Sequence, residues 1–222
     1  MDFYWYISIT KVQVLKEGLA KSFRSYLDSV SVTLKTLWFE VGASLKKPQE
    51  GALGDLIADL KRIEKALKAE GDVKDFQSLS DGKPPVLFSF RGEATRMIDQ
   101  GAYWVALERR PSALLLVGSA SNAIGVAPRM DGQISPSADP MGAIKAMFVG
   151  SGEHGIMGSS DTMSYVWSTV WESDSGSLIR PEIEGLGVFG GVVQASKSLA
   201  SKYGQGGIER IVVGSPVYIR QA

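Results

Sequence analysis

Hydroxyl, amide and amine side chains follow two of the most apolar segments of the chain. The run at residues 113–117 is unbroken and ends at turn-forming residues, which predicts a strand buried on both faces. Residues 3–9 are aromatic and β-branched and predict another strand. In open α/β sheets, ligands bind beyond the carboxyl ends of strands, where backbone N–H groups can approach an anion. We therefore expect a pocket for a small anionic ligand at these two ends. Its candidate residues are Ser8, Thr10, Lys11, Gly118, Ser119, Ser121 and Asn122.

Simpler interpretations of these residues stay open. The hydroxyl and amide residues after the central run could serve only as helix caps, and Lys11 could be a solvated residue in the first turn of a helix. The segment 118–125 fits neither the Walker pattern nor the dinucleotide-binding fingerprint. The last apolar segment contains Gly214, Ser215 and Pro216, which form either another small hydroxyl-bearing motif or merely a bulge.

No catalytic residue is assigned. The only histidine, His154, lies among glycines, and with Ser119 and either Asp161 or Glu153 it could form a hydrolytic triad. The Gly-x-Ser-x-Gly turn that would support such a nucleophile is missing at Ser119.

Metal and cofactor chemistry also find little support. One histidine and no cysteine exclude most zinc sites. The acids of the loop-rich middle, Asp131, Asp139, Glu153 and Asp161, are conceivable magnesium ligands but are usually solvated. We assign no metal and expect no cofactor.

The elements that must position these residues follow from periodicity. Residues 53–67 repeat apolar side chains at three and four, which predicts a helix that Gly71 ends and whose outer face, including Glu64 and Lys68, is solvated. Other helices are predicted at 11–27, 141–148 and 192–203, and strands at 30–41, 72–79, 86–91, 103–108 and 208–219. Residues 109–111 join two strands in a hairpin. Residues 163–171 favour a strand, with a buried helix as the alternative, and the glycine-rich 180–191 predict neither. The expected fold is a single α/β domain over residues 1–222, with a mixed β-sheet flanked by about four helices.

The composition limits the function classes. The chain has 222 residues, of which 44% are hydrophobic and 22% charged, and its 24 basic residues balance 24 acidic ones. A neutral chain is a poor partner for nucleic acid, because binding depends on neutralising phosphates. No segment reaches the roughly 18 apolar residues of a membrane span, and the N-terminus lacks the features of a secretory signal. We expect a soluble, cytoplasmic protein that binds neither nucleic acid nor membrane.

Aromatic residues cluster in three predicted strands, at residues 4–6, 103–104 and 165–171. Consecutive aromatics in a strand point to opposite faces of the sheet. If helices leave one face of the sheet uncovered, these side chains form an exposed apolar surface, which suggests a homo-oligomer or a protein partner. The alternative is a core on both sides of the sheet.

Three segments resemble motifs of an uncharacterised bacterial family. Residues 4–15 are similar to its opening Tyr-x-Tyr-Val-Ser-Asp-x-Lys-Val-Asp-Met-Leu, residues 212–219 to its closing Leu-Gly-(Ser/Thr)-Pro-Leu-Tyr-Val, and residues 116–125 to its internal Gly-Gly-Ser-x-x-x-x-Leu-Gly. Two acids of the family's opening are Ile9 and Gln13 here, so any metal or base role of those acids would be lost. The resemblance implies a bacterial, soluble, single-domain protein and supplies no activity.

The expected function is a non-enzymatic ligand-binding or self-assembling module. A bacterial signalling or defence system is the expected context, and it rests on the resemblance together with the lack of convincing catalytic residues. The alternative is a small-molecule hydrolase or transferase that acts at the loop of residues 119–122.

Overall fold

The structure, a computed structural model, describes residues 3–19, 50–71, 73–79, 87–99, 101–125, 159–173, 180–202 and 207–222. The helices of this part of the chain are α1 (Ile9–Leu19), α3 (Glu50–Glu70), α5 (Ser159–Glu172) and α6 (Lys197–Lys202), with the 3-10 turns η1 (Phe76–Ser78) and η2 (Ala120–Asn122). The strands are β1 (Tyr4–Ile7), β2 (Lys74–Asp75), β3 (Leu87–Asp99), β4 (Ala102–Arg109), β5 (Ser112–Ser119), β6 (Glu182–Gln194) and β7 (Arg210–Gln221).

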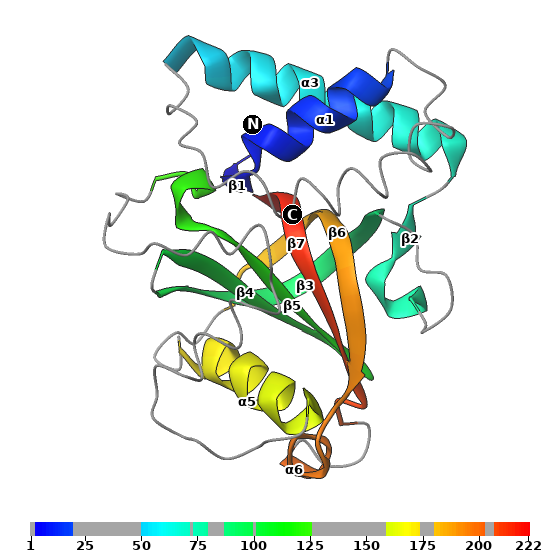
Figure 1. Ribbon diagram of the computed structural model, residues 1–222, viewed down its shortest axis with the longest axis vertical. Coiled ribbons are helices and arrows are strands. Elements are labelled where there is room, and N and C mark those ends of the chain that lie inside the picture. The colour runs from blue at the N-terminus through cyan, green and yellow to red at the C-terminus, as the bar shows by residue number, and fades with distance from the viewer. Residues whose placement is uncertain are drawn as a thin grey trace.

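The sheet closes on itself. Hydrogen-bonded neighbours run in the order β3, β4, β5, β7 and β6, and β6 returns to β3. Within this ring only the β5–β7 pair is parallel. Two short strands lie outside the ring: β1 pairs with the C-terminal part of β7, and β2 pairs with the N-terminal part of β3. The sheet is therefore mixed, as predicted, but it forms a barrel rather than a flat layer between helices (Figure 1). The rule that placed a ligand beyond the strand ends holds for open sheets, so this architecture removes its basis.

Glycines make room for two phenylalanine rings inside the barrel. Phe88 and Phe90 on β3 belong to the apolar cluster that fills it. A Cβ added at Gly187 would lie 2.6 Å from Cζ of Phe88, and one at Gly185 would lie 2.6 Å from Cζ of Phe90. A ring of five strands has little interior space, so β6 carries glycine where the rings press against it. The need for space beside these rings explains why β6 is rich in glycine and shows no periodic apolar pattern in the sequence.

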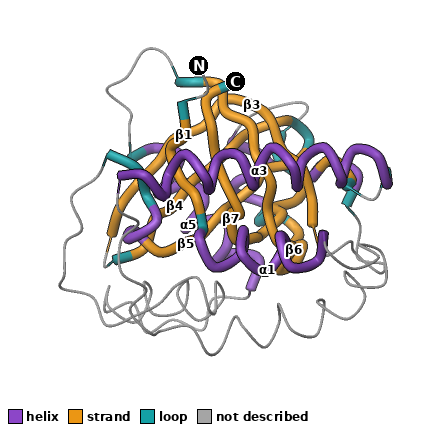
Figure 2. Tube along the Cα trace, turned by 90° about the horizontal axis from the view of Figure 1, so that it is seen from above, coloured by secondary structure: helices purple, strands orange, loops and turns teal. Residues whose placement is uncertain are grey.

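Helices cover the outer surface of the barrel in two layers, at the top and at the bottom of Figure 1. α5 and α6 pack on outward side chains of β4, β5 and β7, and the rings of Trp167 and Trp171 stack there with centroids 5.2 Å apart. α1 and α3 form the other layer, on β1, β6 and β7, and Figure 2 shows α3 crossing over the strands. These layers bury both faces of the central strands.

The strand favoured for residues 163–171 is wrong, because this segment belongs to α5. Its buried apolar residues are Met163, Val166, Trp167, Val170 and Trp171. Steps of three and one along the chain mark one face of a helix. The apparent alternation counted Tyr165, which is 48% exposed. A helix with so wide a buried face also shows apolar residues two positions apart, and this misled the prediction.

Other predicted elements stand where expected. Residues 113–117 lie in β5, fully buried between β4 and β7, and residues 109–111 join β4 to β5 as a hairpin. Gly71, with a φ of 69°, follows the helix predicted at 53–67. The helix predicted at 192–203 is shortened to α6 because β6 continues to Gln194. The predictions for residues 30–41 and 141–148 lie outside the described residues.

The aromatic residues of the predicted strands are core rather than surface. Tyr4, Trp5, Tyr6, Tyr103 and Trp104 are all buried. In the described ranges the exposed large apolar side chains are Phe3, Ile98 and Tyr165. This burial agrees with the alternative interpretation, a core on both sides of the sheet, and not with an exposed aromatic surface. Within the same ranges, no helix combines the length and apolar character that crossing a membrane requires.

Candidate functional site

Strand β7 changes partners between Gly214 and Tyr218. It pairs with β5 up to Gly214 and with β1 from Tyr218 onward, and its register with β6 shifts over the same stretch. β1 and β5 therefore run toward each other beside β7. In the stretch of β7 that faces neither β5 nor β1, the Pro216 carbonyl accepts a hydrogen bond from Lys11 Nζ at 3.0 Å and the Val217 carbonyl accepts one from the Ser8 N–H at 2.8 Å. This gap is where several predicted residues from the two strand ends gather.

The hydroxyl of Tyr6 joins the first group of predicted residues. Asn122 Nδ2 donates to Tyr6 Oη at 3.2 Å, and the Ser8 side chain and the Ser119 backbone also hydrogen-bond to this hydroxyl. Burial raises the pKa of Tyr6 to about 12, although these hydrogen bonds oppose the shift. Tyr6 also fills the space over Gly118, where an added Cβ would lie 2.5 Å from Oη. Gly118 therefore admits a tyrosine ring, not an anion.

The loop after β5 is also locally satisfied. Ser119 caps η2 by accepting a hydrogen bond from the Ser121 N–H at 3.4 Å, and the two hydroxyls are 2.7 Å apart. This is the capping role that the sequence allowed. Thr10 is half-exposed in the first turn of α1 and Ser121 is exposed.

Little of the other predicted chemistry falls in the described ranges. His154, Glu153, Asp131 and Asp139 lie outside them, and Asp161 is in the first turn of α5. Among the residues that can be described, no three of the side chains that usually ligate metals are grouped.

Lys11, on the buried face of α1, forms a second group with Ser215 and Pro216 of β7. The lysine residue is only 6% exposed, and Nζ donates hydrogen bonds to the Ser215 hydroxyl and to the Pro216 carbonyl. Burial lowers the pKa of Lys11 from 10.5 to about 7, and no acid in the described part of the chain opposes that effect. Lys11 is thus neither a solvated residue nor a cation at the mouth of a pocket.

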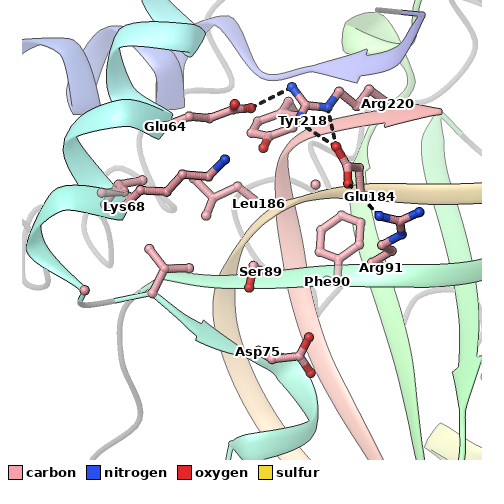
Figure 3. A pocket seen from close by; sticks show the side chains of 14 residues that line it. Glu64, Lys68, Asp75, Ser89, Phe90, Arg91, Glu184, Leu186, Tyr218 and Arg220 are labelled. Atoms are coloured by element: carbon pink, nitrogen blue, oxygen red, sulfur yellow. Dashed lines mark hydrogen bonds and ion pairs between the residues drawn. The ribbon is translucent and has the colours of Figure 1, made fainter. Parts of the chain in front are cut away.

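A cavity of about 480 Å³ lies between α3 and the barrel, away from the predicted residues (Figure 3). Its walls are the C-terminal half of α3, the chain around β2, and parts of β3, β6 and β7. Cavities of this size are typical of small-molecule sites. The charged lining residues are Glu64, Lys68, Asp75, Arg91, Glu184 and Arg220, so acids and bases are equal in number.

A chain of alternating charges closes one side of the cavity. Arg220 Nη1 lies 2.9 Å from Glu64 Oε1, and its Nη2 lies 2.6 Å from Glu184 Oε1. Arg91 Nη1 follows at 3.9 Å from the other oxygen of Glu184. The Tyr218 hydroxyl is buried and bonded to Glu64, and both effects raise the pKa of Tyr218. These groups satisfy one another and form a wall.

Lys68 is the exception in this lining. Figure 3 shows its side chain reaching from α3 across the cavity toward Leu186. It forms no ion pair within the described part of the chain, whereas the nearby acid Asp75 is bonded to Arg109 at 3.0 Å. Leu67 and Leu186 supply apolar surface beside it. Lys68 is itself exposed to solvent, so the cavity combines apolar surface with a positive charge at its rim that no acid of the described chain pairs with.

Sequence reasoning missed this cavity. The four-residue spacing of Glu64 and Lys68 does place them on one helix face, which was predicted to be solvated. Lys68 is exposed as predicted, whereas Glu64 is partly buried against the barrel. Glu184 and Arg220 carry no local signal, because they become neighbours only through the pairing of β6 with β7. The site exists only after α3 packs over that pair.

The chain matches the model of a family of unknown function (DUF7019) over residues 2–168. It belongs to that family. The expected membership of an uncharacterised family is thereby confirmed. Neither the curated proteins nor the solved structures that were compared contain a match. The strands β6 and β7, which supply one side of the cavity, lie beyond the residues matched to DUF7019.

Proposed function

We propose that this DUF7019 member is a non-enzymatic module that binds a small organic anion in the cavity between α3 and the barrel. The observation that carries the proposal is Lys68, which has no acidic partner in the described ranges and stands beside apolar side chains. A carboxylate or phosphate group of the ligand pairs with the Lys68 ammonium, which acts as a point charge. The apolar body of the ligand rests on Leu67 and Leu186.

The state of the other charged groups favours binding over catalysis. Arg220 and Glu184 are held in ion pairs at 2.6 Å, and Glu64 is engaged by both Arg220 and Tyr218. A general acid or base must reach the reacting atom with a proton to give or take. Groups already committed to one another supply a rigid, neutral wall, which suits orientation of a ligand.

The test uses benzoate, hexanoate and phenyl phosphate as probes, with benzamide as the uncharged analogue of benzoate. We expect at least one anion to bind the wild-type protein in calorimetry and to raise its Tm, with benzamide binding at least tenfold more weakly. Lys68→Met weakens anion binding about tenfold, which is about 1.4 kcal/mol. The matched control is Lys65→Met, because Lys65 is exposed on the same helix and does not line the cavity.

Two results would contradict the proposal. One is a lack of binding by all three anions. The other is binding that Lys68→Met and Lys65→Met reduce equally, since that would place the anion on general surface charge rather than in the cavity.

A further inference from the structure

Most polar side chains that line the cavity are already engaged within the protein. The ion pairs of the wall occupy Glu64, Glu184, Arg91 and Arg220, and the Tyr218 hydroxyl is bonded to Glu64. A ligand therefore finds no free hydrogen-bonding side chain on this side of the cavity.

Asp75, on β2, is engaged as well. Its Oδ1 accepts a hydrogen bond from the Gln77 N–H at 2.9 Å, and its Oδ2 accepts one from Arg109 Nη1 at 3.0 Å. Among the polar side chains of the lining, this leaves Lys68 and Ser89 for a ligand.

Ser89 lies on the floor of the cavity. Its neighbours Phe88 and Phe90 fill the barrel, and side chains alternate along a strand, so Ser89 stands on the outer face of β3. The hydrogen bond that its hydroxyl makes within the described chain, to the Lys74 carbonyl, is 3.4 Å long. Hydrogen bonds between a hydroxyl and an oxygen usually measure about 2.5–3.0 Å, so this contact is weak. The hydroxyl is therefore available to a molecule in the cavity.

Lys68 and Ser89 come from different walls. Figure 3 shows Lys68 on α3 and Ser89 on β3 below it, with Leu186 near both. A ligand held at Lys68 by its anionic group extends over this apolar surface toward Ser89. A wholly apolar body would cover the Ser89 hydroxyl without giving it a partner, which is unfavourable, whereas a hydroxyl of the ligand both donates and accepts.

We propose that the ligand is a hydroxylated organic anion, whose hydroxyl group stands at the end of the apolar body away from the charge, and that Ser89 determines specificity for this hydroxyl. The inference rests on the anion site proposed above, since Lys68 holds the charged group while Ser89 reads the other end. Binding through these two contacts forms and breaks no covalent bond.

The experiment compares each anion with its hydroxylated counterpart by calorimetry in the wild type, Ser89→Ala and Ser121→Ala. The pairs are benzoate with 3- and 4-hydroxybenzoate, hexanoate with 6-hydroxyhexanoate, and phenyl phosphate with 4-hydroxyphenyl phosphate. In at least one pair we expect the wild type to bind the hydroxylated anion about fivefold more tightly, which is the effect of one neutral hydrogen bond. Ser89→Ala should lose this preference and leave the Kd of the parent anion within about twofold of the wild type. Ser121→Ala is the matched control, because Ser121 is exposed and does not line the cavity.

The ratio of the two Kd values within one variant separates recognition from a structural effect. Damage to the cavity would weaken both members of a pair alike, and circular dichroism shows that each variant is folded. Equal binding of both members of every pair by the wild type, or a preference that Ser89→Ala retains, overturns the role of Ser89. In either case, binding of a parent anion that depends on Lys68 leaves the anion site itself standing. If no anion binds, with or without a hydroxyl group, both proposals fail.

Discussion

Replacing Lys11 by methionine should change how the stability of this protein depends on pH. In the folded protein the pKa of Lys11 is lowered from 10.5 to about 7 by burial. Below pH 7 both states carry the proton, and the full destabilisation from the buried amine is present. Between pH 7 and 10.5 the unfolded chain binds the proton while the folded protein does not. The free energy of unfolding of the wild type therefore rises with pH in this window, relative to a variant without the amine.

The magnitude follows from linkage for one proton. The slope is at most about 1.4 kcal/mol per pH unit, so the wild type gains up to about 3 kcal/mol on Lys11→Met from pH 7 to about pH 9. Methionine also leaves the Ser215 hydroxyl and the Pro216 carbonyl without this donor, which costs about 1–3 kcal/mol but is independent of pH. The slope and the offset are thus separable.

Urea unfolding of both proteins at several pH values measures the effect. Lys65→Met is the control, because an exposed lysine should give a difference that stays flat with pH. A difference between wild type and Lys11→Met that is equally flat, or that falls as pH rises, would refute the argument that Lys11 is buried without a compensating charge.

Two further predictions concern packing and the charged wall of the cavity. Gly187→Ala should destabilise the protein by about 1–3 kcal/mol, because the new Cβ would lie 2.6 Å from the Phe88 ring, whereas Gly191→Ala, with no atom within 4 Å, should change stability by less than about 1 kcal/mol. Urea unfolding distinguishes the two, and equal effects would mean that the ring does not press on β6. Arg220→Met should destabilise by about 1–3 kcal/mol, because it removes the cation that Glu64 and Glu184 share, and these carboxylates are only 15% and 28% exposed. Arg91→Met, at a side chain that is 58% exposed, should cost less than about 1 kcal/mol, and the reverse order in thermal melts would contradict this account of the wall.

Local patterns determined the elements whose burial is simple. The apolar run at residues 113–117 predicts β5 because a strand covered on both faces needs no alternation, and the spacing within residues 53–67 predicts α3 because one of its faces is solvated. The same logic failed at residues 163–171, where the buried face of α5 is wide enough to show apolar residues at both periods. Local patterns made no prediction for β6. Its glycines are there because the rings of Phe88 and Phe90 need the space, not because glycine favours a strand.

Tertiary structure alone decided the closure of the sheet and the location of both sites. Ser8 and Asn122 were brought together as the sequence suggested, but through Tyr6, which only the fold places between them. The surroundings of Lys11 depend on the point where β7 changes its neighbour from β5 to β1. That point is more than 200 residues from Lys11 along the chain. The cavity likewise forms only where α3 packs over the paired strands β6 and β7. Sequence patterns report the surroundings of a residue only when those surroundings repeat along its own element, and the partners that define these sites come from distant elements.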